Sequence, residues 1–376
     1  MIYFDSAATT LRKPPEVACA VSRAIRQMAS PGRGGHAPAA LAAETVFQCR
    51  QEAADLFNLD SPETVVFTSN ATHGINIAVH TLVRPGSTVL ISGYEHNAVT
   101  RPLYGIPGVT VKTAISPLFR PQRMLEDFER QLTPEVDCVI CTHVSNVFGY
   151  ILPIERIAVL CRERGVPFVL DASQSAGCIP ISMKELGAAF VAMPGHKGLY
   201  GPQGTGILLC GAEAEPLLYG GTGSLSRLQE MPEMLPDRLE AGTHNVCGIA
   251  GLLEGIRFVR KKGVRQILRH EKMLLDSTVK RLSGIQGIQC FGAEDKTVQV
   301  GVLSLRMAGW DCEELGEELG KRGIAVRAGL HCAPLAHRTA GTLESGTVRI
   351  SFSAFNFRRE IGQLGEVLEG LSGTKK

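Results

Sequence analysis

The sequence has few of the features that mark secreted, membrane or nucleic-acid-binding proteins. Its first ten residues lack the basic and apolar regions of a signal peptide. Residues 138–154 are largely apolar and free of Asp, Glu, Lys and Arg, but they contain His143, Asn146, Gly149 and Pro153, so we expect no membrane span. The 39 Lys and Arg residues nearly balance 37 Asp and Glu residues, which argues against a nucleic-acid or membrane partner. We expect a soluble, cytoplasmic protein.

The sequence also lacks the cysteine spacing of a disulfide framework. Its eleven cysteines are an odd number scattered through apolar segments, which is typical of a reducing compartment. Cys138 and Cys141 have the spacing of a metal-binding pair, but they fall in an expected strand, where residues three apart point to opposite faces. Because we find no second ligand pair, we expect no metal site.

Short apolar runs alternate with helical patterns over the first two thirds of the chain. The expected strands cover residues 64–68, 88–91, 109–113, 137–142, 167–170, 188–193 and 207–210, and the expected helices include residues 16–28, 39–57 and 70–82. This alternation predicts an α/β fold with a mainly parallel sheet between helices. Ligands of such folds bind where strands end and helices begin, so functional side chains are expected there.

The pattern changes near Ala241. A long helical stretch at residues 247–282 leads to strands at residues 298–305 and 347–352, flanked by helices at residues 312–322 and 358–371. This order predicts a smaller α+β domain joined to the first by a long helix. We interpret a basic cluster within residues 257–269 as a solvated helix face, with a nucleic-acid site as the less favoured alternative.

Lys197 lies on a Gly-rich connection between two apolar runs, in the sequence GHKGLYG of residues 195–201. Most lysines are exposed, so a surface lysine is the default interpretation. A lysine held among buried strands has a lowered pKa, and its neutral amine attacks carbonyl carbons. We favour this second interpretation because other polar residues follow neighbouring strands.

These polar residues each end a strand or open a helix. Thr72 begins a helix whose free N–H groups suit a phosphate. Asp171 ends a buried strand and suits a protonated ring nitrogen, and Gln174 comes three residues later. His96 suits stacking on a flat ligand, and Asn146 follows a further strand. Taken alone, the Thr72 site is by default a helix N-cap, and helix capping is also the more common role for an aspartate such as Asp171.

Together these residues have an order that resembles the class V, fold-type I pyridoxal phosphate enzymes, most closely the group of cysteine desulfurases and selenocysteine lyases. The resemblance runs essentially end to end and rests on seven motifs: YFDSAA at residues 3–8, GIN at 74–76, SN at 145–146, GHKGLYG at 195–201, EAGT at 240–243, RAGLHC at 327–332 and VR at 348–349. It implies a large cofactor-binding domain of residues 15–255 and a small α+β domain of residues 1–14 and 256–376.

The resemblance also implies a role for each site residue. Lys197 would bind pyridoxal 5'-phosphate covalently and move the substrate's Cα proton, while Asp171 would keep the ring nitrogen protonated. Arg349 would clamp the substrate carboxylate, assisted by Asn146. The further cofactor contacts would come from Ala71, Thr72, His96, Asn146, Gln174, His196 and, across a homodimer with shared active sites, Thr243.

Cys332 resembles the nucleophilic cysteine on the short loop of group II desulfurases. We expect His331 and Arg327, which we also place near the substrate, to favour its thiolate. It would take sulfur from L-cysteine, release L-alanine and carry a persulfide, whose sulfur acceptor is either another protein or only a reductant. Two positions depart from the family pattern: Pro194 replaces a serine that is common near the phosphate, and Leu330 replaces a histidine that is usual in the loop.

Other functions are compatible with the same residues. L-Selenocysteine is an alternative substrate, because it offers the same carboxylate and amine groups. A transaminase, racemase or β-lyase of class V would use Lys197 and Arg349 but not Cys332. A non-catalytic binding protein with this fold is less favoured, because Lys197, Asp171 and Arg349 are all present.

Overall fold

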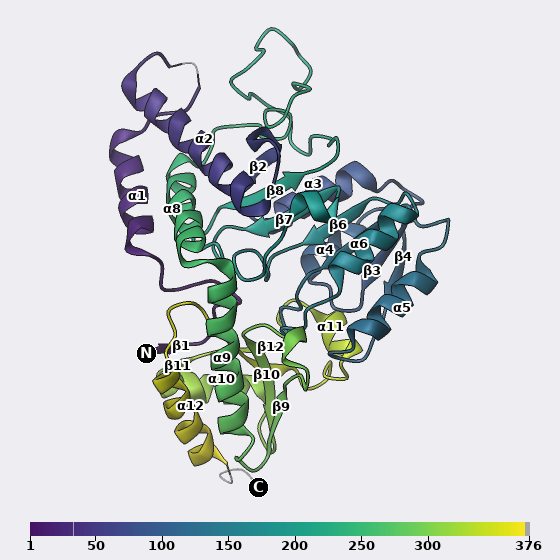
Figure 1. The fold of residues 1–376 in the computed structure, drawn as a ribbon, viewed down its shortest axis with the longest axis vertical. Coiled ribbons are helices and arrows are strands. Elements are labelled where there is room, and N and C mark those ends of the chain that lie inside the picture. The colour runs from purple at the N-terminus through teal and green to yellow at the C-terminus, as the bar shows by residue number, and fades with distance from the viewer. Residues whose placement is uncertain (33, 373–376) are drawn as a thin grey trace.

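A seven-stranded sheet forms the centre of the larger part of the molecule in the computed structural model, which describes residues 1–32 and 34–372 (Figure 1). The strand order is β2-β8-β7-β6-β5-β3-β4. Strands β7, β6, β5, β3 and β4 run parallel, and β8 runs antiparallel to both of its neighbours. The predicted α/β fold with a mainly parallel sheet is therefore confirmed. The strands are β2 (Val65–Thr68), β3 (Thr88–Ser92), β4 (Thr110–Ala114), β5 (Cys138–Thr142), β6 (Phe168–Asp171), β7 (Phe190–Pro194) and β8 (Gly206–Cys210).

Helices cover both faces of this sheet because successive strand residues point to opposite sides. One face packs against α2, α5, α6 and α8, and the other packs against α3 and α4. Cys141 belongs to the first of these cores and Cys138 to the second, so the two thiols lie on opposite faces as predicted. The helices are α1 (Pro15–Gln27), α2 (Ala37–Phe57), α3 (Ala71–Leu82), α4 (Asn97–Tyr104), α5 (Pro121–Gln131), α6 (Ile154–Glu163), α7 (Met183–Leu186) and α8 (Val246–Lys262), with a 3-10 turn η1 (Pro62–Thr64).

The smaller part of the molecule contains an antiparallel sheet of order β12-β13-β10-β9. Its strands are β9 (Ile288–Phe291), β10 (Val302–Met307), β12 (Arg327–Gly329) and β13 (Thr347–Ser351), and its helices are α9 (Val264–Leu282), α10 (Cys312–Lys321), α11 (Pro334–Thr339) and α12 (Arg358–Leu371). The N-terminal strand β1 (Ile2–Tyr3) pairs with β11 (Ile324–Ala325), so the first residues of the chain lie beside this part. The residues that follow β1 lead from here toward the larger sheet (Figure 1).

Two predicted elements differ in the structure. The long helix expected at residues 247–282 is interrupted at Gly263, whose φ of +85° favours glycine, and α8 and α9 meet there. The strand expected at residues 298–305 begins only at Val302. Before it, the Asp295 side chain accepts a hydrogen bond from the amide of Thr297 and starts a 3-10 turn, η2 (Lys296–Val298).

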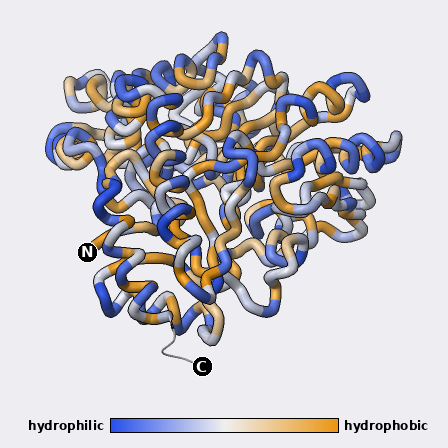
Figure 2. Tube along the Cα trace, turned by 60° about the horizontal axis from the view of Figure 1, so that its bottom comes forward, coloured by the Kyte–Doolittle hydropathy of each residue, from blue (hydrophilic) through white to orange (hydrophobic). Residues whose placement is uncertain are grey.

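The hydrophobic segments lie mainly in the interior strands, and hydrophilic segments run along the outer helices (Figure 2). In residues 1–32 and 34–372, none of the helices has both the length and the apolar character needed to cross a membrane.

Candidate active site

Four polar residues at or shortly after the carboxyl ends of neighbouring strands have side chains that meet at one edge of the large sheet. His96 follows β3, Asn146 follows β5, Asp171 ends β6 and Lys197 follows β7. Parallel strands bring their carboxyl ends to the same edge, and these residues line one cavity of about 500 Å³, part of it open to solvent. The same cavity is also lined by Ala71, Thr72, Gln174 and His196.

Lys197 lies in the loop between β7 and β8. Burial lowers the pKa of its amine to about 8, the nearby Arg349 lowers this pKa further and Asp171 opposes the shift. Near pH 8 a large fraction of the amine is therefore neutral, which is the form that attacks an aldehyde carbon.

His96 caps the N-terminus of α4 with its side chain. Its Nδ1 accepts a hydrogen bond of 3.0 Å from the amide of Ala98, which places the proton of the neutral ring on Nε2. Burial is the main cause that lowers the pKa of His96. The charges of Lys197 and Arg349 lower this pKa further, and the charge of Asp171 opposes the shift. The ring is therefore neutral at pH 7, and a neutral flat ring in this cavity suits stacking on a flat ligand.

Asp171 and Gln174 offer one acceptor and one donor to the cavity. Asp171 is 3% exposed, and its Oδ1 accepts a hydrogen bond of 2.9 Å from the amide of Ser173. A buried carboxylate needs further compensation, which a protonated ring nitrogen provides. Gln174 donates from Nε2 to the carbonyl of Ala7 at 3.0 Å, and its second amide proton is available for a ligand oxygen.

The start of α3 provides a site for an anion. Asn70 uses its side chain to bind the amide of His73 at 2.9 Å, and its carbonyl binds the amide of Gly74 at 3.3 Å. The amides of Ala71 and Thr72 come before these bonded groups, where a helix has free N–H groups that attract phosphate. The cavity thus combines an amine, a carboxylate, a flat ring and an anion site, and these residues fit pyridoxal phosphate.

His196 adds a neutral imidazole to this anion site. Its Nδ1 lies 3.0 Å from Oγ1 of Thr9. Burial lowers the pKa of His196 to about 4, and the positive charges of Lys197 and Lys13 act in the same direction. The ring is therefore uncharged at pH 7 and can serve as a hydrogen-bond donor to an anion.

The loop that carries Cys332 is short and is held at two points. It joins β12 to α11, and both His331 and Cys332 have positive φ values of 51° and 55°. The carbonyl of His331 accepts a hydrogen bond of 2.8 Å from Nδ2 of Asn146, and that of Cys332 accepts one of 2.8 Å from the amide of Asn97. Cys332 itself is exposed. Strained backbone at two successive residues, fixed by neighbours of the cavity, is typical of a functional loop.

The expectation that His331 supplies positive charge to Cys332 was wrong. His331 is 9% exposed and its Nε2 lies 3.2 Å from Oγ1 of Thr347. Burial, with the nearby cationic Arg349, lowers the pKa of His331 to about 2, so the imidazole is neutral at pH 7. Arg327 remains the cationic neighbour in the motif, and its guanidinium lies 3.1 Å from a carboxylate oxygen of Asp5.

Arg349 is buried among fixed partners. Its Nη1 donates to the carbonyl of Asn146 at 2.9 Å, and its Nη2 binds Oδ1 of Asp5 at 2.9 Å. Its buried Nε has no hydrogen-bond partner among the described residues. The guanidinium therefore keeps one N–H donor without a partner, which a substrate carboxylate could accept.

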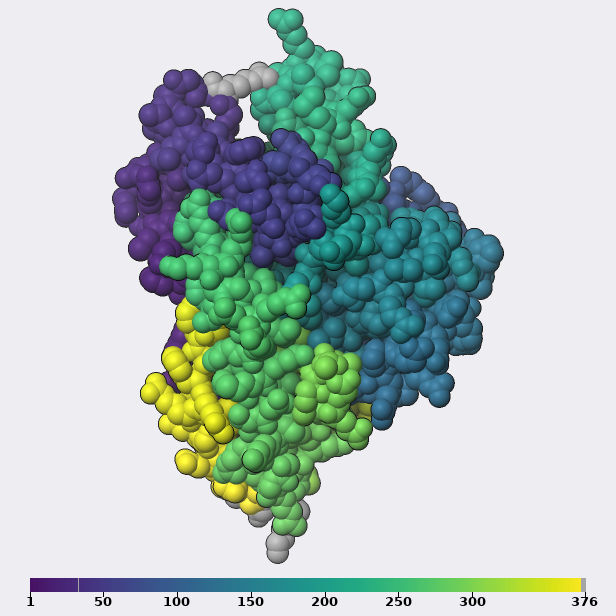
Figure 3. Space-filling view, in the orientation of Figure 1, coloured from purple at the N-terminus to yellow at the C-terminus, as the bar shows by residue number. Residues whose placement is uncertain are grey.

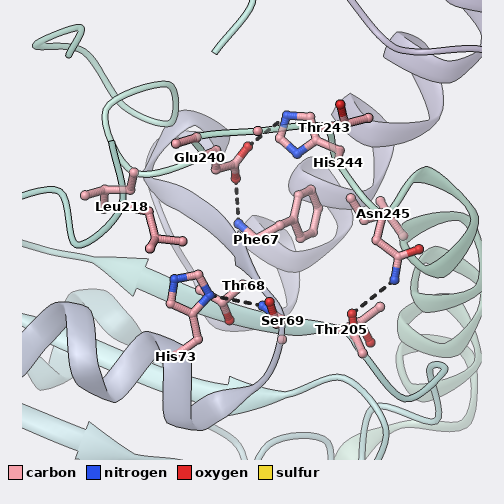
Figure 4. A pocket seen from close by; sticks show the side chains of 16 residues that line it. Phe67, Thr68, Ser69, His73, Thr205, Leu218, Glu240, Thr243, His244 and Asn245 are labelled. Carbon is pink, nitrogen blue, oxygen red and sulfur yellow. Dashed lines mark hydrogen bonds and ion pairs between the residues drawn. The ribbon is translucent and has the colours of Figure 1, made fainter. Parts of the chain in front are cut away.

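Thr243 does not line the cavity of Lys197. It lies in a separate pocket with Glu240 and His73 (Figure 4). Glu240 anchors this segment through a buried ion pair with Arg50. Within one chain the structure does not bring Thr243 to Lys197, so a contact of Thr243 with a bound cofactor would need a second chain.

The sequence predicted no role in the site for Asp5 or for Lys13. Asp5 pairs with both Arg327 and Arg349, and Lys13 contacts the carbonyl of His196. Asp5 lies in the motif YFDSAA, and a charged residue in this largely apolar stretch is a signal that could have marked it. Nothing in the sequence pattern marked Lys13.

The chain is similar to known proteins over nearly its whole length. Residues 2–364 match the family described as Aminotransferase class-V. The chain is 33% identical to a probable cysteine desulfurase of Methanothermobacter thermautotrophicus over 99% of this chain and 95% of that protein. It is 35% identical to one of Mycolicibacterium paratuberculosis over 96% of this chain and 54% of that longer protein. An apo cysteine desulfurase structure from Thermococcus onnurineus superposes with a TM-score of 0.90 at 30% identity, covering 99% of this chain and 94% of that one.

Proposed function

Because the chain belongs to the class-V aminotransferase family, we propose that it is a cysteine desulfurase that uses pyridoxal phosphate, converts L-cysteine to L-alanine and leaves a persulfide on Cys332. One observation carries the choice among class V activities. An exposed cysteine stands on a strained loop, and the loop's carbonyls are bound by Asn146 and by the residue next to His96. A transaminase or racemase has no need for a thiol there.

The reaction divides among residues of this chain. Bound pyridoxal phosphate supplies the electron sink for the substrate's Cα. Arg349 binds and orients the substrate carboxylate, and Lys197 takes and returns the Cα proton. The thiolate of Cys332 attacks the substrate sulfur, so that an S–S bond forms as the S–Cβ bond breaks. Overall, L-cysteine and the Cys332 thiol give L-alanine and a persulfide, without an external oxidant.

The short loop favours the group II type of desulfurase. Two residues, Leu330 and His331, separate β12 from Cys332, and α11 begins at Pro334. The thiol is therefore held near the cavity rather than on a long mobile segment. The persulfide is exposed to a second protein, and we propose a protein acceptor in the cytoplasm.

A homodimer with shared sites explains the position of Thr243. The segment of residues 216–239 projects from the molecule (Figure 3), and its Leu218, Tyr219, Leu228 and Met234 are exposed. Such apolar side chains on a projecting segment suit burial against a second copy. Mixing Lys197→Ala chains, which we expect to be inactive, with Thr243→Ala chains, which we expect to have reduced activity, tests this proposal, because a mixed dimer has one site with both residues intact. Recovery of activity on mixing is expected, and no recovery in a demonstrated mixed dimer contradicts shared sites.

The activity is tested directly by incubating the purified chain with pyridoxal phosphate, a thiol reductant and L-cysteine. We expect a cofactor absorbance band and stoichiometric L-alanine and sulfide. L-Selenocysteine in a parallel reaction separates the two substrate preferences. Cofactor binding with pyruvate or D-cysteine as the product would instead point to a β-lyase or a racemase.

A further inference from the structure

Lys13 is a partly buried lysine whose hydrogen bonds go to neutral groups. Its Nζ lies 2.6 Å from Oγ1 of Thr10 and 3.1 Å from the carbonyl oxygen of His196. Burial lowers the pKa of Lys13 to about 8, so it is still mainly charged at pH 7. Lysines are seldom placed away from water without a carboxylate, which makes this one a candidate for a role in the site.

The carbonyl that Lys13 contacts belongs to the peptide bond between His196 and Lys197. The same oxygen lies 3.1 Å from the amide of Thr10, 3.0 Å from the Thr10 hydroxyl and 3.3 Å from the Thr9 hydroxyl. A carbonyl oxygen has two lone pairs, so the Lys13 amine, the Thr10 amide and the Thr10 hydroxyl are already an unusual concentration of donors, and the Thr9 hydroxyl can donate to Nδ1 of His196 instead. Because Lys13 donates to the Thr10 hydroxyl, the proton of that hydroxyl is free to point at the carbonyl.

The loop of Lys197 is fixed from its other side by its own backbone. The amide of Gly195 binds the carbonyl of Thr205, and the amide of Gly201 binds the carbonyl of Gly195, both at 2.8 Å. The amide of Tyr200 binds the carbonyl of Lys197 at 2.9 Å. Residues 9–13 therefore hold the side of this loop that its own backbone hydrogen bonds do not. The loop carries His196 and Lys197, which are both proposed to contact the cofactor.

We propose that Lys13 is a positioning residue of the active site, which acts with Thr10 to fix the His196–Lys197 peptide and to keep positive charge beside the anion site. The fixed peptide sets the direction of both the His196 ring and the Lys197 amine. The charge of Lys13 also adds to the burial and the Lys197 charge that keep His196 neutral. This inference rests on the proposed cofactor site but not on the proposed substrate.

Hydrogen exchange in the cofactor-free protein tests the positioning directly. The variants are Lys13→Met, which keeps the length of the side chain, and Thr10→Val, which keeps its shape; Arg12→Met and Thr10→Ser are their controls. We expect several-fold faster amide exchange at Thr10 and in residues 195–201 for Lys13→Met and Thr10→Val. Both controls should exchange like the unaltered chain. Unchanged exchange in Lys13→Met, or equal acceleration in Arg12→Met, overturns the inference.

Cofactor release is the second measurement. Loss of a hydrogen bond from a charged donor predicts release of pyridoxal phosphate faster by about tenfold in Lys13→Met. The pH midpoint of the cofactor absorbance should shift in this variant and not in Arg12→Met. If the unaltered chain binds no cofactor, the proposed function fails while hydrogen exchange still decides the role of Lys13. If Lys13→Met does not fold, Thr10→Val and Thr10→Ser make the same comparison.

Discussion

The carbonyl oxygen of Cys332 accepts a 2.8 Å hydrogen bond from the amide of Asn97, the residue that follows His96. The proposed nucleophile is thus tied to the helix start that presents the proposed stacking ring. Asn146 ties the preceding carbonyl, that of His331, to the strand end next to Asp171. The loop and the cavity are therefore one structural unit, although Asn146 and His331 are 185 residues apart in the sequence.

Replacing Asn146 by Ala should loosen this unit. The variant loses the bond to the His331 carbonyl, and one such bond corresponds to about 1 kcal/mol, or roughly a fivefold effect. We expect alanine formation to slow by at least this factor while the cofactor band persists. Steady-state rates with the cofactor absorbance measured in parallel check this. An unchanged rate would show that the loop needs no anchor at His331.

The pKa of Lys197 predicts how cofactor attachment depends on pH. Only the neutral amine reacts, so the attachment rate should rise about tenfold per pH unit below pH 8 and level off above it. Stopped-flow mixing of cofactor-free protein with pyridoxal phosphate measures this rate. Borohydride reduction and peptide mapping should place the label on Lys197, and Lys197→Ala should take up none. If the attachment rate instead reached half of its maximum near pH 10.4, which is the pKa of a free lysine, the result would contradict a buried amine.

Arg349→Lys keeps the charge but loses the planar pair of donors. A lysine cannot replace the contacts to Asp5 and Asn146 and also bind a carboxylate at two points. We expect the KM for L-cysteine to rise on the order of a hundredfold, with a smaller loss in kcat. Circular dichroism should show that the variant folds. A KM equal to that of the unaltered enzyme would remove Arg349 from the substrate site.

Glu240→Gln should destabilise the fold through Arg50. Both side chains are buried, and breaking such a pair leaves an uncompensated charge, at a cost of about 3–5 kcal/mol. The control is Glu135→Gln, because the Glu135 side chain is 57% exposed in its pair with Lys112, and this variant should change little. Urea unfolding of the cofactor-free variants measures both. Equal stability of the two variants would mean that the Glu240 segment is held by other contacts.

The sequence predicted most of the large sheet because its signal is local. Apolar runs such as residues 137–142 and 167–170 are bounded by polar or Gly-rich segments, and the residues at and just after their carboxyl ends line the cavity. The order of His96, Asn146, Asp171 and Lys197 along the chain predicted their meeting, because parallel strands align their ends. The catalytic roles of these residues and the division at residue 255 stay predictions.

The parts of the fold and of the site that the sequence did not predict depend on contacts between distant residues, which no local sequence pattern indicates. Asp5 meets Arg349 across more than 340 residues, and Lys13 meets His196 across 183. The motif around His331 suggested a cation, but tertiary burial makes the ring neutral. The helical pattern of residues 247–282 continued through Gly263, where a single positive φ separates two helices.

The central claim is that Cys332 takes the sulfur. The structure offers a matched control, because Cys19 is also exposed but lies in α1, where it borders a different cavity with Pro15 and Leu41. With pyridoxal phosphate and a reductant, L-cysteine should give L-alanine from the unaltered chain and from Cys19→Ala. Cys332→Ala should give essentially none while retaining its cofactor band. Equal alanine formation by Cys332→Ala and Cys19→Ala would contradict the persulfide on Cys332.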